Sequence, residues 1–397
     1  MLVRSFGEAY EALDRGSADR EPMLLTTPPG AAVFALPTDV TTPAAVVDLA
    51  RLDRNLAAMA AAASEQGMAL RPHAKTHKSA SIARRQHAHG AVGLTVATVA
   101  EARDLAADGC RNLFVAYPVW AGTAEQAAAL RALDEQVVLH VGVDSEDGAA
   151  ALARAVPGAR VMLEVDCGQR RSGVPPEAIL RLAQACLREG LLVEGVFTHP
   201  GHAYAAVSGV AQAAADERRA LARAGEGLES LIGRQPVVSG GSTPTASRHL
   251  DGGMTEVRPG TYVFGDAQQL RLSNLPVSEV ALVVATRVVS RPRPGEVVLD
   301  AGSKTLSTDR PPWLEGFGHL PDAPEAVVHT LTEEHAVVRG APAEWAVGAL
   351  LAIVPNHVCT AVNLAGELVV VEDGAVVDTW AADAGARRRM LPAVHDR

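Results

Sequence analysis

The sequence of 397 residues is poor in cysteine, has no long apolar run and carries no excess of positive charge. Its four cysteines are widely spaced and do not indicate a disulfide framework, so we expect a reduced, cytoplasmic setting. No stretch approaches the roughly 20 apolar residues of a membrane-spanning helix, and the start of the chain lacks the apolar core of a targeting signal. The net charge of -10 argues against nucleic acid or an anionic membrane as a partner, because both repel a negative surface.

What the sequence does contain is enough apolar material for a sizeable core, with 48% hydrophobic and 21% charged residues. Short apolar segments alternate with alanine-rich helical segments, a pattern that predicts βαβ units and a parallel sheet. The candidate strands are MALRPH, GLTVAT, NLFVAY, VVLHVGV, ARVMLEVD, LVEGVFTH, QPVVSGG and TEVRPGTYVF. These eight segments match a (β/α)8 barrel, and an open doubly wound sheet is the alternative.

The residue composition changes after Leu275, where valine-rich segments separated by turn residues predict a C-terminal antiparallel β domain. The stretch EDGAV within it is typical of a hairpin turn. We therefore expect a barrel over residues 41–275 and a β domain over residues 276–397. Residues 1–40 would form an N-terminal segment that supplies an edge strand, serves as a linker or packs on the β domain.

The stretch LRPHAKTHK concentrates basic residues where an apolar segment ends. On an extended segment Arg71, His73 and Lys75 would share one face, which places Lys75 at the carboxyl mouth of a barrel. Lys78 would face elsewhere. An inward lysine near other cations is suited to Schiff-base chemistry, and a solvated basic loop is the alternative interpretation.

The stretch VVSGGSTPT, from Val237 to Thr245, places two glycines and several hydroxyl groups directly after an apolar strand. Such a turn can cradle a phosphate with backbone amides and hydroxyls, and it follows the seventh candidate strand, where barrels often bind phosphate. A plain loop is the alternative. Together with Lys75, a phosphate cradle predicts pyridoxal phosphate as the cofactor.

The stretch PNHVC places His357 and Cys359 two residues apart, so that both would face one side of a strand. Imidazole and thiolate are a good zinc pair, although two ligands do not complete a site and the match could be accidental. His199 and His202, in THPGH, could face the same cavity or be ordinary hydrogen-bonded loop histidines.

Besides these motifs, the sequence contains TTPAAVVDLARLDRN, EVDCGQRRSGV, THPGHAY, EVRPGTYVF and DAGSK, and all of these stretches lie within roughly residues 38–385. The motifs and their order along the chain resemble those of the D-serine dehydratase and D-threonine aldolase family. That family comprises fold-type III pyridoxal-phosphate enzymes with an alanine-racemase-like barrel and a C-terminal β domain. The resemblance covers most of the chain and is far more specific than any single motif.

The resemblance also implies roles for individual residues. Lys75 would carry pyridoxal 5'-phosphate as a Schiff base, with Arg171 and Tyr204 close to the cofactor. His357 and Cys359 would bind a divalent metal, zinc in the first place, with manganese or magnesium as alternatives. Arg170 stands where relatives often have a small residue. The phosphate would be held by Ser239, Gly240, Gly241, Ser242 and Thr243.

The activity implied is that of a lyase acting on β-hydroxy D-amino acids. The dehydratase reaction is a β-elimination that yields a keto acid and ammonia, and the pair of His357 and Cys359 resembles the dehydratase branch. The alternatives are retro-aldol cleavage to glycine and an aldehyde, as in D-threonine aldolases, and a non-catalytic pyridoxal-phosphate carrier. Family analogy also suggests a homodimer.

Overall fold

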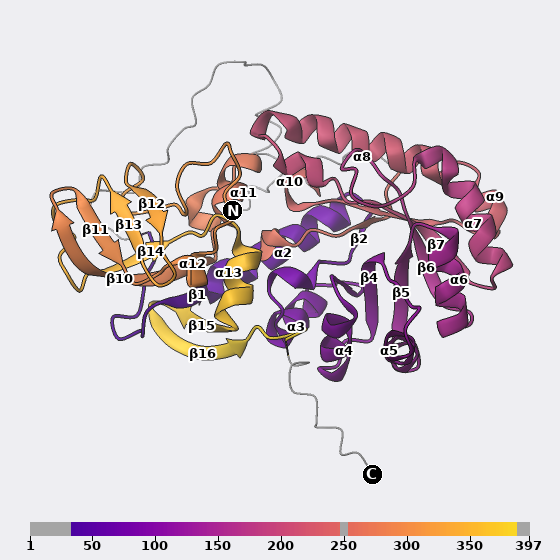
Figure 1. Cartoon of the computed structure of the whole chain (residues 1–397), viewed down its shortest axis with the longest axis horizontal. Helices are drawn as coiled ribbons and strands as arrows, with labels where there is room; N and C mark the ends of the chain where they lie inside the picture. Colours follow the sequence, from indigo (N-terminus) through magenta and orange to yellow (C-terminus); the bar gives the residue numbers. More distant parts are fainter. Residues whose placement is uncertain (1–32, 247–252, 387–397) are drawn as a thin grey trace, which may run out of the picture. The chain divides into compact units, whose positions relative to one another are not determined.

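The computed structural model describes residues 33–246 and 253–386 of the chain (Figure 1). Contacts group the chain into two compact units, a β unit of Met1–Gln66 with Thr261–Trp380 and a barrel unit of Gly67–Gly260 with Ala381–Arg397. The expected domain boundaries after residues 40 and 275 stay predictions.

A closed barrel of parallel strands forms the centre of the barrel unit, in the order β2-β9-β8-β7-β6-β5-β4-β3. Its strands are β2 (Ala69–Leu70), β3 (Leu94–Val96), β4 (Asn112–Pro118), β5 (Val138–Val143), β6 (Arg160–Glu164), β7 (Leu192–Phe197), β8 (Val237–Gly240) and β9 (Glu256–Val257). A parallel bridge between His73 and Thr95 joins the two ends of this order, and the Thr95 N–H donates to the Pro72 carbonyl at 2.8 Å. The sheet therefore closes on itself, which confirms the predicted (β/α)8 barrel against the open sheet.

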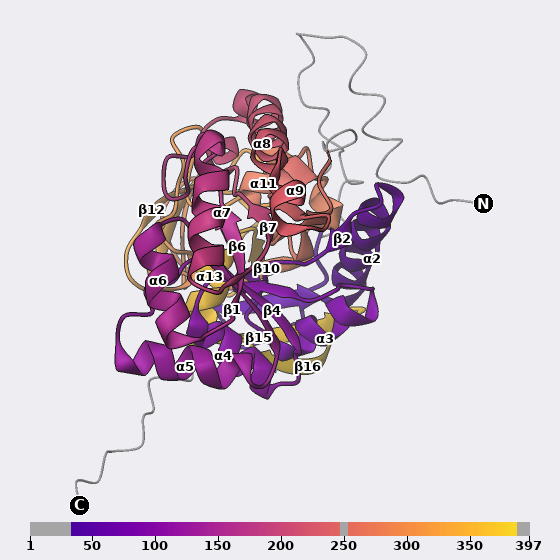
Figure 2. The same ribbon diagram turned by 90° about the vertical axis from the view of Figure 1, so that its right-hand side faces the viewer.

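Helices follow the strands and lie on the outside of the barrel, as Figure 2 shows for α4 to α7. They are α3 (Ala80–Ala88), α4 (Val99–Ala107), α5 (Ala124–Asp134), α6 (Glu146–Ala155), α7 (Ile179–Arg188), α8 (Val210–Gly225), α9 (Leu228–Ile232) and α10 (Thr243–Ala246). Thr98, Thr123 and Ser145 cap three of them, because each side chain accepts the amide N–H three residues on.

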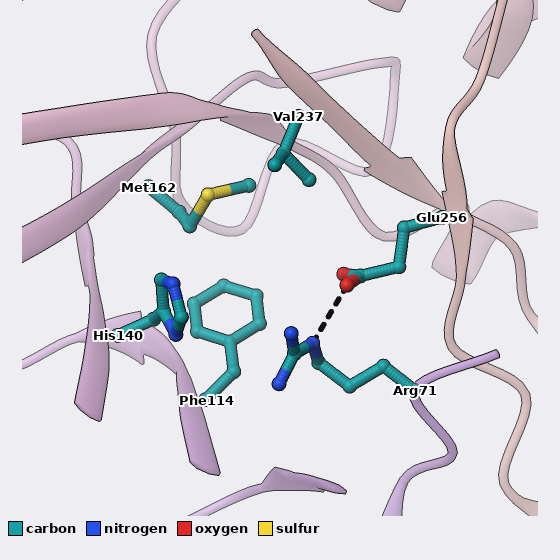
Figure 3. A pocket seen from close by; sticks show the side chains of 6 residues that line it. All are labelled: Arg71, Phe114, His140, Met162, Val237 and Glu256. Atoms are coloured by element: carbon teal, nitrogen blue, oxygen red, sulfur yellow. Dashed lines mark hydrogen bonds and ion pairs between the residues drawn. The ribbon is translucent and has the colours of Figure 1, made fainter. Parts of the chain in front are cut away.

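The inside of the barrel is filled by side chains that alternate inward along the strands. The rings of Phe114 and Phe197 meet edge to face with centroids 5.0 Å apart, and Arg71 forms an ion pair with Glu256. Figure 3 shows the cavity that remains, about 20 Å³ in volume and lined by Arg71, Phe114, His140, Met162, Val237 and Glu256. A space of this size holds about one water molecule, so the interior supports the fold and a substrate site belongs at the rim.

The β unit contains a mixed sheet whose strands are β1 (Ala44–Asp48), β10 (Leu282–Arg293), β11 (Glu296–Leu299), β12 (Val327–Leu331), β13 (Ala336–Arg339), β14 (Leu350–Ile353), β15 (Glu367–Glu372) and β16 (Ala375–Ala381). β10 pairs antiparallel with β1, β11 and β14, as the predicted antiparallel domain requires. β1 also pairs parallel with β15, so the sheet is mixed. The predicted hairpin turn is confirmed between β15 and β16, where Asp373 and Gly374 both have positive φ.

The helices of the β unit are α2 (Leu49–Glu65), α11 (Ala267–Leu272), α12 (Ser303–Leu306) and α13 (Val358–Ala365). Phe34 and Val40 are buried in one apolar cluster with Val283 and Ala285 of β10, so this part of the expected N-terminal segment packs on the β sheet. The rest of that segment, residues 1–32, lies outside the described residues. No helix in the part of the chain that the structure describes is long and apolar enough to cross a membrane.

Candidate active site

Lys75 lies in a short turn directly after the first barrel strand. The extended run ends at His73, whose N–H donates to the Pro259 carbonyl at 2.9 Å, and the 3-10 turn η1 (Ala74–Thr76) follows. The prediction of a single extended segment through Lys75 is therefore wrong, because the His73 side chain caps η1 and ends the strand geometry. Lys75 nevertheless lies at the carboxyl end of the strand, the edge where barrel active sites are built.

The neighbouring lysine has a different environment. Lys78 has a positive φ of 50° and its ammonium lies 3.6 Å from a carboxylate oxygen of the buried Glu101. The Lys75 side chain, in contrast, makes no ion pair within the described residues. The two lysines thus differ in their surroundings, and the role of Lys75 as the Schiff-base lysine stays a prediction.

Two imidazoles near Lys75 are held in their neutral form. Burial, followed by the charges of Lys75 and Arg258, lowers the pKa of His73 well below its usual value. Burial and the charges of Lys75, Arg171 and Arg258 do the same to the pKa of His199. The rim therefore combines neutral hydrogen-bonding rings with several cations, an environment that favours an anionic ligand.

Arg258 is a residue that the sequence interpretation missed, although it lies within the segment EVRPG. It directly follows β9, is only 6% exposed and donates from Nη2 to the Thr198 carbonyl. Its guanidinium lies over the rings of Phe114 and Phe197, at 5.4 and 5.2 Å from their centroids. Its buried Nε has no partner among the described residues, so one donor remains for a ligand. Strand alternation from the inward Glu256 would have indicated it.

The predicted phosphate loop divides into two parts. Ser239 Oγ donates to Glu256 Oε1 at 2.6 Å, so this hydroxyl faces the barrel interior. Ser242 is buried in the turn after β8, where its Oγ lies 3.1 Å from Thr245 Oγ1, and Thr243 begins α10. The phosphate prediction therefore depends on the second half of the loop.

A buried carboxylate that the sequence did not indicate lies behind this loop. Glu217 of α8 accepts the Gly241 N–H at 2.6 Å and the Thr245 hydroxyl at 3.1 Å. Gly241 has a φ of 82°, and a Cβ at Gly240 would lie 2.7 Å from Glu217 Oε1. Both glycines are thus needed for the close approach of the loop to α8, and the Gly241 amide is already engaged.

The loop after β6 carries Arg171. Its Nη2 lies 4.0 Å from Glu164 Oε1, and Ser172 Oγ donates to the same oxygen at 2.9 Å. Burial raises the pKa of the Glu164 carboxyl. Arg170 has a φ of 57°, in the left-handed region that favours glycine.

Tyr204, the other residue expected near the cofactor, closes the 3-10 turn η3 (Gly201–Tyr204) after β7 and is half-buried. Lys75, Arg171, Tyr204 and the β8 loop all belong to the barrel unit and follow the carboxyl ends of its strands. Together with Arg258, this set offers a primary amine, hydroxyls and a guanidinium Nε without a partner among the described residues, which fits an anionic aldehyde.

His357 and Cys359 do not lie on a strand, which corrects the prediction from PNHVC. β14 ends at Ile353, and His357 is the N-cap residue of α13, whose second residue is Cys359. The two side chains still meet, because Cys359 hydrogen bonds to His357 across the first turn of the helix. The expected pair therefore exists, but helix geometry and not strand alternation brings it together.

The imidazole of His357 is surrounded by acidic groups. Its Nδ1 lies 2.9 Å from Asp309 Oδ2. Burial alone would lower the pKa of His357, but Cys359, Asp266 and Asp309 together raise it to about 10. Within residues 33–246 and 253–386, no three or more His, Cys, Asp or Glu side chains lie close enough together to hold a metal ion. His357 and Cys359 are therefore two donors, whereas a catalytic zinc site usually has three protein ligands.

Two family models match the chain. The model described as "Alanine racemase, N-terminal domain" matches residues 47–268, and the one described as "Putative serine dehydratase domain" matches residues 281–371. Together they cover the barrel strands and most of the β sheet.

Characterised relatives match over most of the chain. A D-threo-3-hydroxyaspartate dehydratase of Delftia sp. (strain HT23) is 35% identical over 367 residues, 85% of this chain and 96% of that protein. A D-threonine aldolase of Arthrobacter sp is 35% identical over 355 residues, 86% of this chain and 92% of that protein. A solved structure of a D-threo-3-hydroxyaspartate dehydratase mutant in the metal-free form has a TM-score of 0.80 at 32% identity, covering 87% of this chain and 98% of its own.

Proposed function

The chain belongs to the D-serine dehydratase and D-threonine aldolase family, and from this premise we propose that it is a dehydratase of β-hydroxy D-amino acids that uses pyridoxal phosphate and a divalent metal. The reaction is a β-elimination that releases a keto acid and ammonia. The observation that carries the proposal is the position of Lys75, on the rim turn after the first barrel strand and beside the neutral imidazoles of His73 and His199.

Pyridoxal phosphate, when bound, supplies an electron sink for the negative charge that develops at the substrate Cα. Lys75 would hold it through its amine, and Ser242 and Thr243 would bind its phosphate. Arg258 offers its unused Nε and Arg171 its exposed guanidinium to anionic groups at the rim. Because His73 and His199 stay neutral, they add hydrogen-bonding capacity to the rim without adding charge.

The proton transfer is assigned to Lys75. With pyridoxal phosphate and substrate bound, the Lys75 amine would act as the base that takes the proton from the substrate Cα. Loss of this proton and of the β-hydroxyl as hydroxide would amount to loss of water from the substrate, and hydrolysis of the product would give the keto acid and ammonia.

The metal would be held by His357 and Cys359 of the β unit. A divalent ion there supplies Lewis acidity that makes hydroxide a better leaving group. Zinc is our first proposal because imidazole and thiolate are its common ligands, and manganese is the second. A cytoplasmic homodimer is the state we propose from the family resemblance.

Retro-aldol cleavage is the second candidate, favoured by the D-threonine aldolase relative at the same 35% identity. It would need a base for the β-hydroxyl proton and would break the Cα–Cβ bond. Cys359 supports the dehydratase proposal, because the family resemblance places a carboxylate at this position in aldolases.

A product assay separates the two reactions. D-Serine, D-threonine and D-threo-3-hydroxyaspartate are each incubated with the full chain loaded with pyridoxal phosphate and zinc or manganese. We expect equal amounts of keto acid and ammonia from D-serine or D-threo-3-hydroxyaspartate. Glycine and acetaldehyde from D-threonine, without keto acid from the other two, would establish the aldolase instead.

A further inference from the structure

We propose that Asp309 is a positioning residue that holds the Nδ1–H of His357 and thereby presents Nε2 of this imidazole to the metal. The inference rests on the metal part of the proposed function. The geometry that carries it is the 2.9 Å contact between Asp309 Oδ2 and His357 Nδ1, within the β unit.

Metal binding would release the second ring proton that the raised pKa of His357 retains in the metal-free protein, and in the resulting neutral ring each nitrogen has one role. A ring that donates from Nδ1 to a carboxylate leaves the lone pair of Nε2 as its ligand atom. Histidines that bind metals commonly donate their second nitrogen to a carboxylate, which fixes the ring and increases its basicity as a ligand. Asp309 stands in this relation to His357.

The other carboxylate beside His357 is already engaged. Asp266 is buried, and its Oδ1 and Oδ2 accept the backbone N–H groups of Gln269 and Val358 at 2.9 and 3.0 Å. Asp266 therefore caps α11 and binds the start of α13. Among the carboxylates in the described part of the chain, Asp309 is thus the one placed to orient the ring.

Asp309 is itself fixed by the residue next to the histidine. The buried Asn356 donates from Nδ2 to the carbonyls of Asp309 at 3.1 Å and Gly316 at 3.0 Å. Ser307 Oγ accepts the Asp309 N–H at 3.1 Å. The adjacent residues Asn356 and His357 thus contact the backbone carbonyl and the carboxylate of Asp309, a residue 48 positions away in the chain.

The arrangement predicts that Asp309 contributes to metal affinity without being a ligand. Loss of such a carboxylate typically weakens metal binding by about 10–100-fold, because the ring is no longer held in the required tautomer and orientation. Loss of the ligand nitrogen itself, in H357A, should abolish binding at this site. The loss of metal affinity on substitution of Asp309 should therefore be smaller than the loss on substitution of the ligand His357, and this difference separates the two roles.

The test measures metal binding without turnover. The full chain loaded with pyridoxal phosphate is freed of metal, and zinc and manganese affinities are measured by chelator competition for the wild type, D309N, D309E, H357A and D322N. Asp322 is an exposed aspartate of the same unit whose carboxylate accepts, among the described residues, a single backbone N–H from Val33, which makes D322N the matched control. We expect D309N to bind about 10–100-fold more weakly, D309E to recover part of the loss and D322N to match the wild type.

Imidazole nitrogen NMR of the zinc form gives a second readout, which a purely structural role would not move. The wild type should show Nδ1 protonated and Nε2 bound to the metal. Wild-type affinity in D309N, or metal on Nδ1, would overturn the inference while leaving the metal centre in place. A wild-type chain that takes up no divalent metal would instead overturn the metal centre of the proposed function, and the inference with it.

Discussion

Arg71 and Glu256 form a buried ion pair inside the barrel, with Nε and Oε2 2.7 Å apart and side chains only 9% and 6% exposed. Arg71 follows β2 and Glu256 begins β9, the neighbouring strand, and Glu256 also accepts the Ser239 hydroxyl. The rim residues Lys75 and Arg258 follow β2 and β9, and Ser242 follows β8, the strand that carries Ser239. The ion pair therefore supports the part of the barrel that carries the candidate site.

Breaking this pair should destabilise the fold. E256Q keeps the shape of the side chain but leaves the Arg71 charge buried without a counterion, which typically costs about 3–5 kcal/mol. Urea unfolding of the wild type and E256Q measures the difference. E334Q, which removes an exposed carboxylate beside Lys304, is the control and should leave the unfolding midpoint unchanged. An unchanged midpoint in E256Q would contradict the role of the ion pair.

Lys75 and Lys78 should differ in their effect on the cofactor. K75A should lose the covalent attachment of pyridoxal phosphate and about 10²–10⁴-fold in kcat, because the base is removed with the amine. K78A should keep the attachment, since Lys78 pairs with Glu101. Absorption spectra and mass spectrometry after borohydride reduction measure the attachment. Attachment that survives in K75A would assign the cofactor to another lysine.

Ser242 and Ser239 provide a matched pair for the phosphate loop. S242A should weaken pyridoxal-phosphate affinity by about tenfold or more, because a hydrogen bond to a charged group is lost. S239A should leave affinity near the wild-type value and lower thermal stability, because its hydroxyl bonds to Glu256 in the barrel interior. Equilibrium dialysis and thermal unfolding of both variants distinguish the two roles, and the reverse pattern would show that Ser239 faces the phosphate.

His77 should make stability depend on pH. Burial lowers its pKa to about 4, and its ring accepts the Ser79 N–H at Nδ1 while Nε2 contacts Gln86, as a neutral imidazole can. The folded pKa lies below the unfolded value of roughly 6.5, so the unfolded chain binds more protons between them. Stability is thus present above pH 6.5 or so and decreases as the pH falls toward 4, by about 3 kcal/mol in total.

The pH effect is measured as the difference between the wild type and H77Q in urea unfolding at successive pH values. H77Q cannot titrate at this position, so its free energy of unfolding should decrease less over this range. Parallel curves for the two proteins would mean that His77 titrates as it does in the unfolded chain.

Metal removal should separate catalysis from cofactor binding. Chelation should abolish turnover, and zinc or manganese should restore it, while the absorption of bound pyridoxal phosphate stays constant because Lys75 and the metal pair use different residues. C359A should show the same loss without recovery. Full turnover after chelation would remove the metal from the mechanism.

Much of the fold could be predicted because it depends on local pattern. The eight barrel strands and the hairpin at Asp373 and Gly374 lie where alternation and turn residues indicated them. The strand predicted through PNHVC was wrong, because the residues after Ile353 leave the sheet and begin α13. Local apolar character is the same for a short buried strand and a short buried helix, so periodicity alone could not separate them.

The sequence by itself determined which residue types are available and in which order, and that was enough to predict Lys75, the β8 loop and the pair of His357 and Cys359 as candidate site residues. Only the tertiary structure decided which distant side chains complete them. Glu217 behind the loop, Arg258 over the two phenylalanine rings and Asp309 at His357 are contacts between residues 24 to 144 positions apart. Such pairs arise because closing a barrel and folding a sheet bring separate segments together, and no local pattern specifies which ones meet.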